Sequence, residues 1–197
     1  EAETAVREGF KHIILSDKEI SKEKAAIPMV LTIGAINSKL VNSGIRGFAS
    51  INVQTGEVLD THSFAVLLGV GATTINPYIA FDSINQRYEK KLFGKLSFED
   101  CIRRYIQSID KGLLKIMSKM GISVLSSYRG GCNFEALGLS RSVVAEYFPG
   151  MVSRISGIGI IGIEKKIKEL HKKAFGKNIS ILPIGGIYKY RKNGETH

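Results

Sequence analysis

Short apolar runs alternate with segments of helical periodicity in the first part of the chain. The apolar runs, each of strand length, occupy residues 12–15, 48–53 and 73–75. Between them, apolar residues recur at three- and four-residue steps over 28–44 and 58–68. This order predicts βα units on a parallel sheet, either barrel-like or doubly wound. Three strands are too few to close a barrel, so the expected fold class is α/β with incomplete βα units, a partial barrel-like parallel sheet.

A polar and aperiodic segment over residues 85–97 predicts an internal boundary. Ser97 and Asp100 then form the pattern of a capping box, in which the serine oxygen accepts a free backbone N–H at the start of a helix. Apolar residues follow at helical spacing from Phe98 onward. They predict one long amphipathic helix that ends near Lys119.

The rest of the chain has a less regular pattern, which we interpret as mostly helical. Residues 122–125 are expected to form a strand, and the polar residues 126–131 the loop at its carboxyl end. Residues 133–137 and 140–148 are expected to form short helices. Apolar residues line one face of a last predicted helix over 163–175, and lysines occupy the rest of its surface.

The composition indicates a globular protein, because 44% of the 197 residues are hydrophobic and 23% are charged. Two cysteines, Cys101 and Cys132, form no CxxC pair, and the four histidines are scattered. Neither a disulfide framework nor a metal site is therefore predicted. No signal peptide is visible, and the uncharged run over 61–81 is too polar for a membrane-spanning helix. We expect a cytoplasmic protein with no membrane contact.

Positive charge accumulates towards the end of the sequence. Lys and Arg outnumber Asp and Glu by 28 to 18, and residues 151–197 hold 10 of the basic and 3 of the acidic residues. The lysine-rich helix over 163–175 is typical of a solvated surface, but it also permits a basic binding module that contacts nucleic acid. No aromatic-flanked RNA-binding signature accompanies it, so nucleic acid is the less favoured partner.

The loop 126–131 is the strongest candidate for chemistry. Ligands of parallel α/β sheets bind beyond the carboxyl ends of the strands, and this loop offers hydroxyl groups, a guanidinium group and backbone N–H groups there. Ser127, Tyr128 and Arg129 are accordingly the candidate cofactor-binding residues. An ordinary turn with a solvated arginine is the alternative.

Two other motifs carry weaker signals. Residues 157–162 match G-x-G-x-x-G before a helix, which would suit an independent dinucleotide-binding enzyme. The preceding residues resemble no strand, and no acid lies between Glu169 and Glu195 to hold a ribose, so a glycine-rich connection is favoured. His62 and Ser63 are neighbours without a visible orienting acid, so no catalytic residue is assigned.

Several long sequence runs resemble the large (α) subunit of glutamate synthase. Residues 14–28, 64–72 and 76–81 resemble the end of that family's central domain. More distinctive runs resemble the opening of its FMN-binding barrel domain and the approach to the next element: 111–123, 127–130, 134–140, 153–159, 185–188 and 193–197. The resemblance thus implies two parts, residues 1–90 from the central domain and residues 97–197 from a mostly helical start of the FMN-binding (β/α)8 domain.

The resemblance also implies a function for the parent enzyme. Glutamate synthases transfer the amide nitrogen of glutamine to 2-oxoglutarate and reduce the product to give two glutamates. Ammonia passes through a tunnel to the FMN barrel, and electrons arrive through FMN and an iron–sulfur cluster from a small NAD(P)H-dependent subunit or from ferredoxin. This chain would be a structural, tunnel-forming fragment that is inactive alone, binds no cofactor or metal itself, and has the rest of the large chain as its partner.

Overall fold

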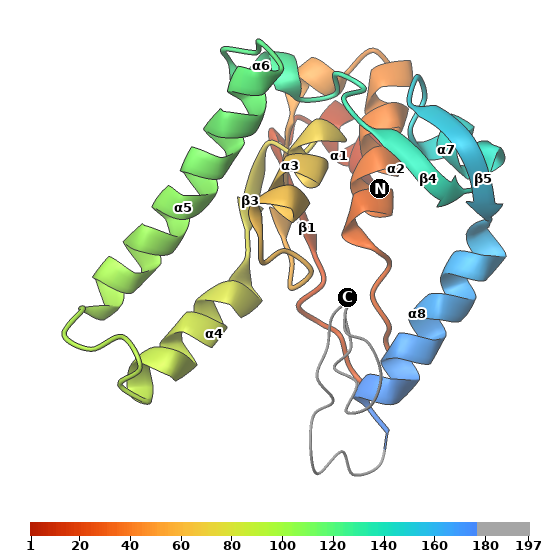
Figure 1. Ribbon diagram of the computed structural model, residues 1–197. Coiled ribbons are helices and arrows are strands. Elements are labelled where there is room, and N and C mark those ends of the chain that lie inside the picture. Colours follow the sequence, from red (N-terminus) through yellow and green to blue (C-terminus); the bar gives the residue numbers. More distant parts are fainter. Residues whose placement is uncertain (177–197) are drawn as a thin grey trace, which may run out of the picture.

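The computed structural model describes residues 1–176, which form helices and two short parallel sheets (Figure 1). The expected runs at 185–188 and 193–197 lie outside these described residues. The helices are α1 Ala2–Arg7, α2 Met29–Asn42, the 3-10 turn η1 Arg46–Phe48, α3 Thr61–Gly69, α4 Tyr78–Glu89, α5 Phe98–Lys119, α6 Leu125–Tyr128, α7 Arg141–Tyr147 and α8 Ile160–Ala174. The strands are β1 His12–Ser16, β2 Ser50–Gln54, β3 Thr74–Asn76, β4 Glu135–Leu139 and β5 Val152–Ile158.

The first sheet has the order β1-β2-β3, and all its strands are parallel. The register pairs His12 with Ser50 and Asn52 with Thr74. Helix α2 connects the first two strands and α3 the next two, and right-handed crossovers place both helices on the same face of the sheet. The predicted α/β fold with incomplete βα units on a parallel sheet is confirmed.

The hydrophobic core lies between this sheet and its two helices. The inward-facing side chains of β2, Ile51 and Val53, are buried, as are Ile33 of α2 and Phe64 of α3. Apolar residues of later elements join the same cluster, namely Ile109, Ala136, Val144 and Phe148. The chain on both sides of the predicted boundary at 85–97 therefore shares one core.

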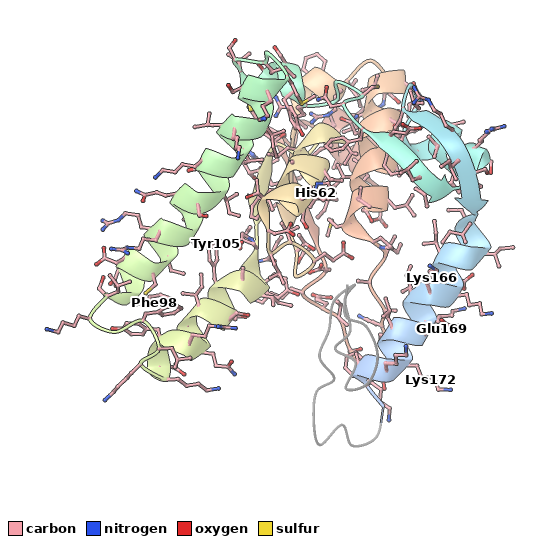
Figure 2. All side chains as sticks on the ribbon, viewed as in Figure 1. His62, Phe98, Tyr105, Lys166, Glu169 and Lys172 are labelled. Atoms are coloured by element: carbon pink, nitrogen blue, oxygen red, sulfur yellow. The ribbon has the colours of Figure 1, made fainter. Side chains whose placement is uncertain are left out.

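Helices α4 and α5 form a hairpin beside α3 (Figure 1). The predicted cap of α5 is confirmed, because the Ser97 Oγ accepts a hydrogen bond from the Asp100 backbone N–H at 3.1 Å. The sequence pattern did not predict α4, which extends to Glu89 through residues that we expected to be irregular. Two aromatic pairs join the helices: Phe81 with Tyr105 and Tyr88 with Phe98, with ring centroids 6.0 and 5.7 Å apart (Figure 2).

The second sheet corrects three predictions. Residues 122–125 form no strand. Residues 135–139 form β4, although 133–137 were expected to be helical, and residues 152–158 form β5, although the residues before the glycine motif gave only a poor strand pattern. The two strands are parallel, and α7 lies between them in the sequence, so this part is a further βαβ unit. The strands approach closely at Gly138 and Gly157, and these glycines weaken the strand signal of the sequence.

Asp60 caps α3 and gives this helix an expected sensitivity to acid. Its Oδ1 accepts hydrogen bonds from the Ser63 backbone N–H at 2.9 Å and the Ser63 Oγ at 2.8 Å. These bonds lower the pKa of Asp60 from its ordinary value of 3.8. A lowered pKa in the folded state means that the stabilisation is present above the unfolded pKa and is lost as pH falls through the folded one.

We therefore expect Asp60→Ala to reduce the free energy of unfolding by about 1 kcal/mol at pH 7. Asp60→Asn keeps an acceptor that does not titrate, so it should retain most of the stability at pH 7. Between pH 5 and pH 3 it should lose less stability than the unchanged protein does (approximate limits set by the ordinary carboxyl pKa). Urea unfolding at three pH values measures both variants. Equal losses for the two variants at pH 7 would contradict the capping role.

Candidate functional site

One face of the three-stranded sheet is uncovered by the described residues and is almost entirely polar. Side chains that point away from the core alternate with the buried ones along each strand, as the pleat requires. On this face the strands carry His12, Ile14, Ser16, Ser50, Asn52, Gln54, Thr74 and Asn76. Parallel sheets are usually covered on both faces and apolar on both. We call these eight residues the polar face.

Side chains of the polar face form a ladder across the strands. The Ser16 Oγ donates to the Gln54 Oε1 at 2.8 Å, and the Thr74 Oγ1 donates to the Asn52 Oδ1 at 2.7 Å. The Asn52 Nδ2 also lies 3.5 Å from the His12 Nδ1, at the limit of a hydrogen bond. Asn52 is therefore the central residue of the face and contacts both neighbouring strands.

A buried carboxylate closes the carboxyl end of this sheet. Asp17 directly follows β1, and only 7% of the residue is exposed. Its Oδ2 accepts a hydrogen bond from the Thr55 Oγ1 at 2.5 Å, and the Gly56 backbone N–H lies 3.1 Å from both carboxylate oxygens. Asp17 thus joins the end of β1 to the turn after β2. We call Asp17, Thr55 and Gly56 the sheet-end cluster.

Two titratable groups next to the sheet-end cluster have raised pKa values. Partial burial raises the pKa of the Glu57 carboxyl group, and the charge of Asp17 raises it further, although a hydrogen bond from the Met29 backbone N–H at 2.9 Å opposes both effects. Burial and then the Asp17 carboxylate raise the pKa of Tyr78 to about 12. The Tyr78 hydroxyl group is therefore protonated at neutral pH, and it is no general base.

The predicted cofactor-binding residues lie in and directly after the short helix α6. Ser127 and Tyr128 belong to the short helix α6, not to the loop after a strand, because residues 122–125 form no strand. The Tyr128 side chain is only 1% exposed and packs edge-to-face against Phe134. Ser127 is exposed and Arg129 is partly exposed. Of the three residues, only Ser127 and Arg129 are accessible to a ligand in this structure.

The other sequence motifs occupy surface or structural positions. His62 is exposed on α3 (Figure 2), and its neighbour Ser63 bonds to the helix cap Asp60. The glycine motif 157–162 spans the end of β5 and the first turn of α8, but a Cβ atom on Gly157 would overlap the Gly138 backbone. That close approach of two strands explains the glycine without a nucleotide. Lys166, Glu169 and Lys172 lie exposed along α8 (Figure 2).

Sequence reasoning missed most of the polar face and of the sheet-end cluster. The signal for the face was present in β2, where Ser50 to Gln54 alternate strictly between polar and apolar residues. The signal for the cluster was the polar residue that follows β1 and β2, Asp17 and Thr55 respectively. Which of these residues contact one another depends on the strand register, which the sequence does not supply.

Neither a metal centre nor a membrane span occurs in the described part of the chain. Residues 1–176 bring together no group of three His, Cys, Asp or Glu side chains that could hold a metal ion. No helix in the same range combines the length and the apolar character that crossing a membrane requires. The 22-residue α5 is long enough but carries charged residues throughout.

The fold and the site define an α/β segment of βα units with an uncovered polar sheet face. Residues 1–140 match the family model of the glutamate synthase central domain. The chain therefore belongs to the glutamate synthase family. This match continues through residues 85–97, where the sequence predicted an internal boundary.

Three relatives illustrate the similarity. The chain is 55% identical over 197 residues to the glutamate synthase [NADPH] large chain of Azospirillum brasilense. It is 38% identical over 200 residues to the large chain of Bacillus subtilis (strain 168) and 38% identical over 208 residues to the ferredoxin-dependent glutamate synthase of Pyropia yezoensis. Each alignment covers 100% of this chain but only 13%, 13% and 14% of the relative. The chain thus corresponds to a small part of these proteins.

Proposed function

We propose that this chain is a framework segment of a glutamate synthase large chain and that its polar face lines part of the passage for ammonia. In the whole protein, ammonia released from glutamine would combine with 2-oxoglutarate, and reduction would give two glutamates. The segment itself would hold no catalytic residue. Its role would be to support the passage between the site that releases ammonia and the site that consumes it.

The polar ladder across β1, β2 and β3 supports this proposal. A sheet face that packed against a further apolar layer would carry apolar side chains, as the opposite face does with Ile51 and Val53. Ammonia both donates and accepts hydrogen bonds, and buried polar groups need such partners. The hydroxyl and amide groups around Asn52 provide them on a surface of fixed side chains.

The remaining parts of the proposal follow from the family membership. The parent enzyme would be an oxidoreductase that uses FMN and an iron–sulfur cluster, with a small NAD(P)H-dependent subunit or ferredoxin as the electron donor. The rest of the large chain would be the direct partner of this segment. If the C-terminal end of α6 lies near the flavin, Ser127 and Arg129 would contact it, since Tyr128 is buried. The division of residues 1–90 and 97–197 between two domains stays a prediction.

Replacing Asn52 in the full-length enzyme tests the proposal. Leucine has a similar size but no polar group, so Asn52→Leu interrupts the ladder at its centre. Each lost hydrogen bond to the transferred molecule is worth about 1 kcal/mol, which slows transfer roughly fivefold. Glutamine-dependent glutamate formation should fall by that factor, and more than one glutamine should be hydrolysed per 2-oxoglutarate consumed. Glutamate formation from added ammonium should change little.

A matched control separates this effect from a general loss of structure. Asn42 is exposed at the end of α2 and is not part of the polar face, so Asn42→Leu should leave the ratio of glutamine hydrolysed to 2-oxoglutarate consumed at one. The proposal is wrong if Asn52→Leu folds, keeps its flavin and shows the same ratio as the unchanged enzyme.

A further inference from the structure

A groove adjoins β1, the edge strand of the first sheet. It has a volume of about 400 Å³, and its lining comes from β1, from the connection 17–28 and from the first turn of α2. Three isoleucines of this lining are strongly exposed in the described part of the chain: Ile14 by 70%, Ile20 by 43% and Ile27 by 63%. A single exposed isoleucine is ordinary, but three along one groove form a patch that is typical of a contact surface.

The end of α8 is attached to one wall of this groove. The His171 Nε2 donates to the Ser21 carbonyl at 2.8 Å, and the His171 ring centroid lies 4.7 Å from that of Phe175. Ser21 directly follows Ile20, and it exchanges two backbone hydrogen bonds of 3.1 Å with Lys24, which also lines the groove. The chain that leaves α8 therefore starts beside the connection 17–28 (Figure 1).

The sequence after α8 contains an apolar segment within reach of the groove. Residues 179–184 read Ile-Ser-Ile-Leu-Pro-Ile and include no charged residue. The four residues from Phe175 to Ile179 span up to about 14 Å when extended. Since Phe175 packs on the histidine that contacts Ser21, this length is sufficient to reach the groove without a movement of α8.

We propose that residues 179–184 dock in this groove and cover Ile14, Ile20 and Ile27. Burial of apolar side chains on both partners favours the contact. The short connection through α8 keeps the segment close to the groove, so little freedom is lost when it docks. This inference goes beyond the proposed function, because it holds whether or not the polar face lines a passage for ammonia.

The docking would give α8 a structural role. The helix follows β5 of the second sheet at its start and contacts the connection after β1 at its end. None of its residues is buried within the described part of the chain, so the helix has little packing of its own to hold it there. A docked segment directly after α8 would fix that end of the helix to the first sheet.

Amide hydrogen exchange of the full-length protein, measured by mass spectrometry over residues 177–190, tests the docking. Ile27→Asp places a charge in the groove, so the amides of residues 179–184 should exchange about tenfold faster. Leu114→Asp is the matched control, because Leu114 is also 63% exposed but lies on α5, and it should leave this exchange unchanged. The reciprocal variant Ile181→Asp should accelerate exchange over residues 18–27.

Exchange over β2 shows whether the sheet stays folded in the Ile27→Asp variant, and the milder Ile27→Ser replaces it if exchange there also rises. An unchanged rate over 179–184 in a folded variant would overturn the inference, as would an equal acceleration by Leu114→Asp. If another part of the large chain exchanges faster instead, that part covers the groove and the inference is wrong. The same conclusion holds if the variant dissociates an oligomer, since a second copy would then be the occupant.

Discussion

Gly157→Ala should destabilise the β4-α7-β5 unit by about 3 kcal/mol, which is the upper range for overpacking a site that cannot relax. A Cβ atom on Gly157 would overlap the carbonyl group of Gly138 and lie 2.7 Å from its Cα atom. Both groups belong to the backbone, so the added methyl can be accommodated only if β4 and β5 move apart. Amide hydrogen exchange over residues 135–158 should therefore accelerate in the variant.

The chain offers a matched control two residues further on. Gly159 has an ordinary negative φ of −88°, and a Cβ atom there would meet only the Ser140 Oγ at 3.6 Å. Gly159 is also the N-cap residue of α8, so Gly159→Ala should cost no more than about 1 kcal/mol in stability. It should leave amide exchange over residues 135–158 nearly unchanged. If both variants behaved alike, the glycines of the 157–162 motif would have some role other than strand packing.

Asp17→Ala is expected to have the other large effect, a loss of about 3 kcal/mol or more in the free energy of unfolding. The substitution leaves the Thr55 hydroxyl and the Gly56 N–H without their acceptor, and Thr55 is fully buried. Each buried donor without an acceptor costs about 1–3 kcal/mol. Asp17→Asn keeps one acceptor oxygen and should lose less stability than Asp17→Ala.

Denaturant unfolding of Asp17→Ala and Asp17→Asn checks this order. Asp110→Ala, which removes an exposed carboxylate from α5, is the control and should change stability by no more than about 0.5 kcal/mol. A loss for Asp17→Ala no greater than that of the control would show that the sheet-end cluster does not stabilise the sheet.

The first sheet was predictable from the sequence because its signals are local. Apolar runs separated by helical stretches gave β1, β2 and β3 and both crossover helices nearly as they occur. The long helix α5 was equally clear, since Ser97 caps it as the pattern indicated. These elements depend on periodicity and capping, which a single sequence contains.

The second sheet was not predictable in the same way. Gly138 and Gly157 lower the strand signal of β4 and β5, yet each is needed because the strands approach so closely there. The site was missed for a related reason. Asn52 and Asp17 acquire partners only through the strand register and the fold of the turn after β2, and neither is encoded in local spacing.

Chemical labelling of the polar face in the full-length enzyme tests the central proposal most directly. Asn52→Cys places a thiol at the centre of the face, and peptide mapping by mass spectrometry reports its reaction with a small neutral thiol reagent and with a bulky one. If the face lines a narrow passage, the small reagent should modify position 52 and the bulky one should not. Equal reaction with both reagents would indicate an open outer surface, and no reaction with either would indicate a dry packed interface; each result would contradict the proposed passage.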